Sequence, residues 1–333
     1  MHLRTIASVL LALLLCCLPV QAAAPLFHFR NGFWINLHHY LYAQALATSD
    51  NSMPRLRQSA INAQSNVPCP PIPEGERGVW QQAVDFYAVH YLTRDWLFDN
   101  DMRELNDLLS DADNNSDPPA GLPTDLRQVL TQAAAAYRTG CWATHQRANS
   151  AWIEALEGKL AQHGTGISQR LEEIYQAKWP VSLVVDVVTY ANWAGAYTYD
   201  HHITADSVNP DYRGDSALEM IFHESSHALD GRLFDQVHEE FARNHADMPR
   251  QFDHALIFFT AGVITKQELH NPDPDYVPVA DRLGIYKRIR HGSEDEKAFR
   301  QYWQPYLEGK TSREKALRGL VQAICCGQGE KSK

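Results

Sequence analysis

The chain has 333 residues, of which 44% are hydrophobic, and it contains 8 Trp, 14 Tyr and 12 Phe. This apolar content suffices for one large domain or two closely joined ones, and it excludes general disorder. The formal net charge of −10 at pH 7 argues against a broad phosphate-binding surface, so we expect no nucleic acid among the partners.

The first 24 residues have the pattern of a secretory signal peptide. His2 and Arg4 precede an apolar run over residues 6–20, and the small residues 22–24 follow it. A signal peptidase needs this order of basic, apolar and small residues, and the run is short for a membrane span. We predict cleavage after Ala22 or nearby, which makes the mature protein periplasmic or extracellular. No later segment is long and apolar enough to cross a membrane.

Residues 25–179 are predicted to form an N-terminal helical region. Helical patterns cover residues 27–46, 78–109, 125–140, 144–163 and 167–178, separated by a Pro-rich connector and a polar loop. Four cysteines remain in the mature chain, at positions 69, 141, 325 and 326. In an exported protein they permit two disulfides in three possible connectivities, among which the sequence does not choose.

The pattern changes at residue 180. Residues 181–188 are β-branched and predict a buried strand, and residues 194–203 are consistent with a second strand at a sheet edge. Helical patterns then cover residues 216–230, 232–244 and 250–268, and shorter ones reach about residue 325. We therefore predict an α+β fold that is predominantly α-helical, in which residues 180–333 form a catalytic region with a small β-sheet before the helix over 216–230.

The helix predicted over residues 216–230 carries the sequence His223-Glu224-Ser225-Ser226-His227. Side chains four residues apart lie one above the other on a helix, so both imidazoles can reach one metal ion. Zinc lowers the pKa of a bound water and polarises a carbonyl, and Glu224 is placed to act as a base on that water.

The two histidines lie opposite the apolar stripe of this helix. That stripe is formed by Leu218, Ile221, Phe222, Ala228 and Leu229. Histidines with only a packing role would lie within the apolar stripe, so the pattern argues against that role. A second alternative to a metal site, in which the two histidines are simply exposed to solvent, remains open. We predict a site for one Zn²⁺ per chain, with His223 and His227 as ligands and Glu224 as the catalytic residue.

These residues resemble the zincin metallopeptidases, over roughly residues 181–269. As in that group, the positions between and after the histidines are uncharged, and a predicted edge strand precedes the motif helix. The resemblance implies hydrolysis of peptide bonds by a metal-activated water, with Glu224 passing its proton to the leaving amine. It also implies that the edge strand binds the substrate backbone by strand addition.

The third zinc ligand is not fixed by the motif. The metzincin branch places a histidine where this chain has Leu233, and the gluzincin branch uses a glutamate of a later helix. Asp247 stands near the gluzincin spacing but in a turn-like stretch, whereas Glu240 does not stand at that spacing. His254 lies in an apolar helical pattern, where a buried imidazole needs a partner. We therefore place His254 ahead of Glu240 and Asp247, in a divergent gluzincin-like branch.

Weaker candidates surround this site. Asp230 could orient a ligand imidazole or cap the helix. Tyr276 and Tyr286 could donate to a developing oxyanion, although packing is the more ordinary role of Tyr. The pairs at 38–39 and 201–202 add histidines that could approach the site, but adjacent helical residues face different directions.

The predicted function is an exported zinc-dependent hydrolase, in the first place a metallopeptidase that acts on peptides or proteins. Two alternatives remain open. One is a non-catalytic cell-envelope or binding protein with a structural zinc site, and the other is a zinc hydrolase of non-peptide substrates. A structural site does not need Glu224, which favours the enzyme.

Overall fold

The computed structural model describes residues 25–50, 53–181, 183–229, 231–270, 273–289 and 292–329. The predicted signal peptide and Asp230 lie outside the described residues. The chain is predominantly helical with one small mixed sheet, as the sequence predicted. Within the described part, no helix is both long enough and apolar enough to span a membrane.

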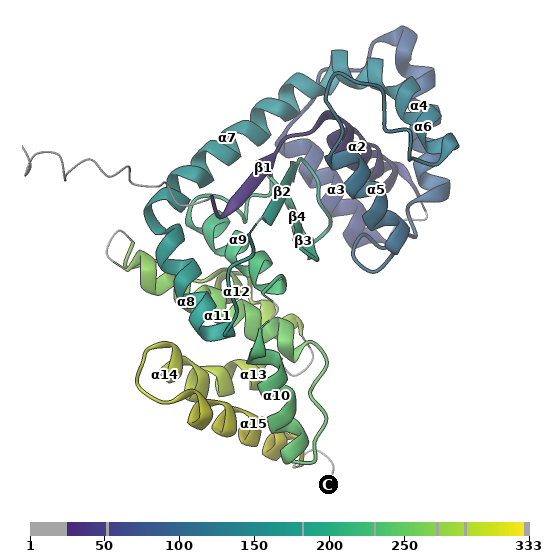
Figure 1. The fold of residues 1–333 in the computed structure, drawn as a ribbon. Helices are drawn as coiled ribbons and strands as arrows, with labels where there is room; N and C mark the ends of the chain where they lie inside the picture. Colours follow the sequence, from purple (N-terminus) through teal and green to yellow (C-terminus); the bar gives the residue numbers. More distant parts are fainter. Residues whose placement is uncertain are drawn as a thin grey trace, which may run out of the picture.

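The N-terminal half contains one strand and a group of helices (Figure 1). Its elements are β1 (Phe27–Arg30), α2 (Phe33–Thr48), α3 (Pro54–Asn66), η1 (Glu74–Glu76), α4 (Arg77–His90), α5 (Asn100–Ser110), α6 (Thr124–Tyr137), η2 (Arg138–Trp142), α7 (Ala143–Lys159), η3 (Leu160–Gly164) and α8 (Thr165–Tyr175). The first helical pattern of the sequence therefore begins later than expected. Its first residues form β1, where Phe27 packs edge-on against Trp179 and Phe222.

The C-terminal half begins with the other strands and ends in helices. Its elements are β2 (Leu183–Val188), β3 (Ala196–Tyr199), β4 (His202–Asp206), α9 (Asp215–His227), α10 (Arg232–Arg243), α11 (Phe252–Leu269), α12 (Val279–Leu283), η4 (Ile285–Arg288), α13 (Gly292–Ala298), η5 (Phe299–Trp303), α14 (Gln304–Leu307) and α15 (Arg313–Gly329). The segment expected to be one edge strand is a hairpin, β3 and β4. The chain reverses at Asp200, whose φ of 48° is a left-handed conformation that Asp tolerates.

The four strands are ordered β1-β2-β4-β3. The β1–β2 and β2–β4 pairs are parallel, whereas β3 runs antiparallel to β4 and lies at the sheet edge. Because β1 comes from the N-terminal half and pairs with β2, the two predicted regions share one sheet.

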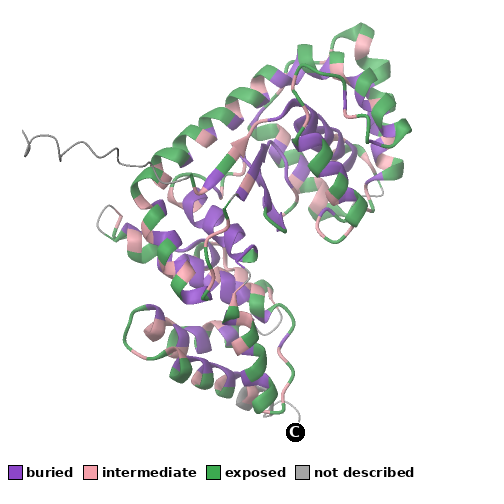
Figure 2. Cartoon of the chain, in the orientation of Figure 1, coloured by how far each residue is buried: buried purple, intermediate pink, exposed green. Residues whose placement is uncertain are grey.

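The sheet separates two apolar cores, and both of its faces are buried (Figure 2). One face presents Val185, Val187 and Ile203 to the core around α9 and α11. The other face contributes Tyr197 and Tyr199 to the core built on α2 and its neighbouring helices. Side chains alternate between the faces of a strand, so β3 contacts both cores.

Candidate metal centre

Helix α9 is anchored through its apolar stripe. Leu218, Ile221 and Phe222 are fully buried in the core that also contains Val185 and Val187 of the sheet. The helical wheel drawn from the sequence predicted this apolar stripe. Ser225 and Ser226 donate their hydroxyl hydrogens to the carbonyl oxygens one turn earlier, so these polar residues need no partner outside the helix. The histidines are thereby carried on a well-fixed element.

Helix α11 approaches α9 closely at Gly262. A Cβ at this position would lie 3.3 Å from Glu219 Oε1 of α9 and 2.9 Å from Pro278, so a side chain would push the helices apart. The helix begins after Gln251, whose φ of 65° is left-handed, and its first turn carries His254. One turn later the Phe258 ring stacks on His223, with 3.8 Å between ring centroids.

The structure brings His223, His227 and His254 together. Ring centroids are 5.1 Å apart for His223 and His227, and 5.2 Å apart from each of them to His254. Each residue offers a ring nitrogen, and the three nitrogens lie within 4.8 Å of one another. His223 is buried, His254 is half-buried and His227 is exposed, so the group opens to solvent on the side of His227.

The chemistry of these imidazoles fits a metal ion. The Nδ1 atom of His223 is buried and has no hydrogen-bond partner within the described part of the chain. Burial, followed by the neighbouring His227 and His254, lowers the pKa of His223 well below its usual value, and burial also lowers the pKa of His254. Metal ligation requires the neutral imidazole, and three nitrogen donors with an open side are typical of catalytic zinc sites.

Glu224 points to the edge strand and is not one of the three clustered ligands. Its Oε2 accepts a hydrogen bond of 2.6 Å from the Thr198 hydroxyl of β3, which also lies 3.1 Å from the backbone oxygen of Glu224. Burial raises the pKa of the Glu224 carboxyl to about 7, although the Thr198 hydrogen bond acts in the opposite direction. Thr198 was not predicted from the sequence; the only signal was its place in the strand before the motif helix.

Strand β3 has one unpaired backbone edge within the described sheet. The Asp206 N–H donates to Gly195 O, and hydrogen-bonded pairs alternate along an antiparallel ladder. The backbone groups of Tyr197 and Tyr199 therefore form the next hydrogen bonds to β4. The backbone N–H and C=O of Thr198 point away from β4, toward the open edge of the sheet. The residue that holds Glu224 thus also offers backbone groups to an extended chain.

The remaining candidate ligands lie elsewhere. Glu240 pairs with Arg243 of its own helix, Asp247 is exposed, and neither joins the histidine group. The Tyr276 hydroxyl donates to Glu219 Oε2 over 2.7 Å, so it already has an acceptor. Tyr286 lines a separate cavity of about 450 Å³ with Phe259 and Arg300.

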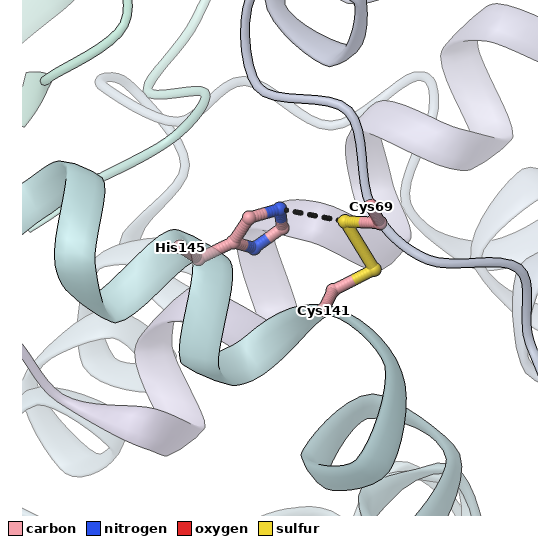
Figure 3. Close-up of side chains that lie close together, drawn as sticks. All are labelled: Cys69, Cys141 and His145. Atoms are coloured by element: carbon pink, nitrogen blue, oxygen red, sulfur yellow. Dashed lines mark hydrogen bonds between the residues drawn. A yellow bond between two sulfur atoms is a disulfide. The ribbon is translucent and has the colours of Figure 1, made fainter.

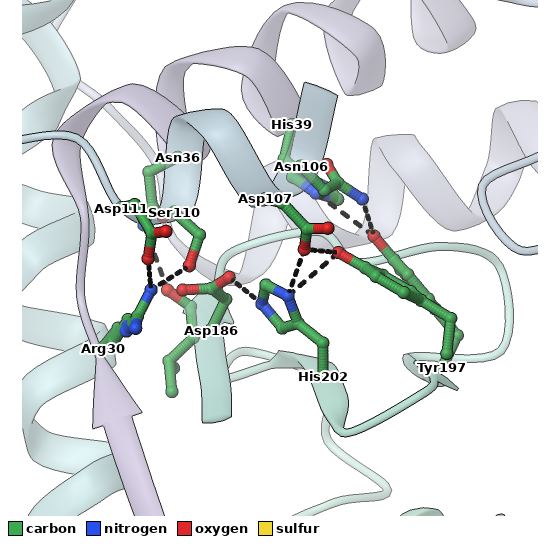
Figure 4. Close-up of polar contacts among 12 residues, drawn as sticks. Arg30, Asn36, His39, Asn106, Asp107, Ser110, Asp111, Asp186, Tyr197 and His202 are labelled. Carbon is green, nitrogen blue, oxygen red and sulfur yellow. Dashed lines mark hydrogen bonds and ion pairs between the residues drawn. The ribbon is translucent and has the colours of Figure 1, made fainter. Parts of the chain in front are cut away.

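Three other histidines named by the sequence lie across the sheet, on the side of α2 and α5. His38 Nδ1 lies 2.5 Å from Tyr87 Oη, and His39 Nδ1 lies 2.9 Å from Tyr190 O. His202 bridges Asp186 of β2 and Asp107 of α5 (Figure 4). His202 links α5 to the sheet and His39 links α2 to the chain just after β2, whereas His38 joins α2 to α4. Within the described residues, none of the three belongs to the histidine group of α9 and α11.

Comparisons of the chain with protein-family models, with curated proteins and with solved structures found no match. The resemblance to zincins therefore stays a prediction from the sequence motif.

Proposed function

We propose that this chain is a zinc-dependent hydrolase with a zincin-like core, and that it cleaves peptide bonds. The convergence of His254 with the two motif histidines supports the proposal most directly, because the three come from two helices that the motif alone does not bring together. His223, His227 and His254 would hold one Zn²⁺. When bound there, zinc supplies Lewis acidity toward a water nucleophile and the scissile carbonyl.

The protein groups have separate tasks in this reaction. Glu224 accepts a proton from the attacking water and donates it to the leaving amine. Thr198 fixes the Glu224 carboxylate by its 2.6 Å hydrogen bond. The backbone of β3 binds the peptide as an added strand, which sets its register beside Glu224. These tasks favour a peptidase over a structural zinc protein, which has no use for a fixed carboxylate beside an open site.

Metal analysis and two variants test the proposal. We expect about one zinc per purified chain, lost in His223→Ala and retained in the control His238→Ala, whose imidazole is exposed on α10. Glu224→Gln should retain zinc and lose hydrolysis of a broad peptide library, whereas the exposed-site control Glu239→Gln should remain active.

Other outcomes separate the alternatives. Full activity of Glu224→Gln would contradict the mechanism, and absence of zinc from the wild-type protein would contradict the site. If the zinc-loaded protein cleaves no peptide but loses thermal stability on chelation, the structural alternative holds. If it cleaves only ester or amide compounds that are not peptides, the substrate assignment is wrong and the zinc chemistry stands.

A further inference from the structure

A second group of potential metal ligands lies in the N-terminal half. Cys69, in the connection between α3 and η1, forms a disulfide with Cys141 of η2, with 4.9 Å between their Cα atoms. The Nε2 atom of His145, on α7, lies 3.1 Å from Cys69 Sγ (Figure 3). Cys141 and His145 are buried, whereas Cys69 is half-buried.

His145 is fixed from its other side. Its Nδ1 lies 2.9 Å from the Tyr137 hydroxyl, and both residues are fully buried. Burial lowers the pKa of His145 to about 4, so the ring is neutral. A buried ring nitrogen needs a good partner, and a disulfide sulfur is a poor one, whereas a thiolate or a metal ion is a strong one. The placement of His145 is therefore better explained by the reduced state of the cysteine pair.

The spacing supports the same conclusion. Cys141 and His145 are four residues apart in continuous helical chain, the spacing by which His223 and His227 share one face. The two sulfur atoms and a ring nitrogen of His145 lie within 4.8 Å of one another. An imidazole that binds a metal through one ring nitrogen usually donates its other N–H to a fixed acceptor, and the Tyr137 oxygen lies 2.9 Å from His145 Nδ1 in that position.

We propose that reduction of the Cys69–Cys141 disulfide by an external dithiol creates a second zinc site, with Cys69, Cys141 and His145 as its ligands. The reaction transfers two electrons and two protons from the dithiol, which becomes a disulfide, and leaves two thiols on the protein. Zinc then binds both sulfurs as thiolates and releases two protons to solvent. Thiolate and imidazole are the donors that zinc prefers.

The sulfurs move most when this site forms. They are about 2 Å apart in a disulfide, whereas Zn–S and Zn–N bonds of about 2.3 and 2.0 Å place tetrahedral ligands roughly 3.8 Å apart for two sulfurs and roughly 3.5 Å for sulfur and nitrogen. The present 3.1 Å between Cys69 Sγ and His145 Nε2 must lengthen by roughly half an ångström. The dithiol attacks the half-buried Cys69 and releases the Cys141 thiolate, to which the Tyr40 hydroxyl, 3.4 Å from Sγ, can donate.

Cobalt titration tests this second site apart from the first. We use the full chain with His223→Ala, Cys325→Ser and Cys326→Ser, so that neither the α9 cluster nor the other two cysteines contribute. After anaerobic reduction, one equivalent of Co²⁺ should give intense sulfur-to-cobalt charge-transfer absorption, which the oxidised protein lacks. Tyr137→Phe should weaken binding about 10- to 100-fold, and Cys141→Ser should abolish the band.

The chain with Cys325→Ser and Cys326→Ser alone gives a second measurement if the combined variant is unstable. Its α9 cluster has no sulfur ligand, so the charge-transfer band reports the Cys69–Cys141 site, and the band should appear only after reduction. Circular dichroism of the reduced metal-free protein checks that the fold survives without the disulfide. A folded, reduced protein that shows no band, or a His145→Ala variant with unchanged Co²⁺ affinity, would overturn the proposal while leaving the hydrolase untouched.

Discussion

Thr198 is the residue on which the positioning of Glu224 depends. The hydroxyl of Thr198 donates to a carboxylate that is buried and adjacent in sequence to His223, a ligand of the proposed zinc site. In the proposed reaction, a carboxylate without this bond can rotate away from the path of the attacking water. Thr198 lies on the edge strand and not on the motif helix, so its contribution should affect turnover and not zinc content.

We therefore expect Thr198→Val, which is nearly isosteric, to lower kcat about 10- to 100-fold with zinc content unchanged. Thr198→Ser keeps the hydroxyl and should retain most of the activity. Steady-state kinetics on a cleaved peptide, with zinc analysis of the same samples, measure both effects. Equal kcat for the Val and Ser variants would show that the hydroxyl does not serve the reaction.

At the scale of elements, His202 joins two strands to a helix. It lies on β4, and its Nε2 bonds Asp186 of β2 while its Nδ1 lies 2.8 Å from Asp107 of α5 (Figure 4). Tyr199 of β3 donates to the same Asp107 oxygen over 2.8 Å. Burial lowers the pKa of His202, but the hydrogen bonds and charges of Asp186 and Asp107 outweigh it, so the pKa of His202 is above its usual value.

This bridge makes stability depend on pH. Because the folded pKa of His202 is raised, its stabilisation is complete below the unfolded pKa of about 6.5 and is lost as pH rises through the folded value. We expect His202→Gln to destabilise the protein by about 2 kcal/mol at pH 5.5, and by less at pH 8.5. Thermal unfolding of the wild-type protein and of His202→Gln at the two pH values measures the loss of stability. A loss that is larger at pH 8.5 than at pH 5.5 would contradict the prediction.

The elements also show what the sequence could and could not predict. The apolar stripe of α9 and the start and end of α10 and α11 follow from local periodicity, which adjacent residues determine. The pairing of β1 with β2 joins segments more than 150 residues apart, and no local pattern encodes such a contact. His254 could be proposed as a ligand from the sequence, because an imidazole in an apolar helix needs a partner. Thr198 could not be predicted, because its contact with Glu224 arises only when α9 packs against β3.

At the scale of the whole molecule, the shared sheet ties the two halves together. β1 forms one edge of the sheet, and Ile167 and Leu171 of α8 are fully buried in the core around α9. The predicted catalytic region, residues 180–333, therefore lacks part of its own core and one strand. We therefore infer that the proposed metal centre requires the N-terminal half for its structure.

We predict that a fragment of residues 180–333 does not fold cooperatively. Loss of β1 and α8 exposes the sheet edge and the apolar face of α9, which costs more than the few kcal/mol of net stability typical of a domain. Circular dichroism and thermal unfolding of the fragment, with the full chain as control, give the measurement. A fragment that unfolds cooperatively and retains zinc would show that the two halves are independent domains.

The unequal burial of the three histidines has a consequence for the exchange of the ion. His223 lies under the Phe258 ring and is 4% exposed, whereas His227 faces solvent. An ion that enters the proposed centre would meet His227 first, and a departing ion would leave His227 last. The centre would then be open to small chelators and to competing divalent metals, so the metal supply of its surroundings would decide which ion it carries.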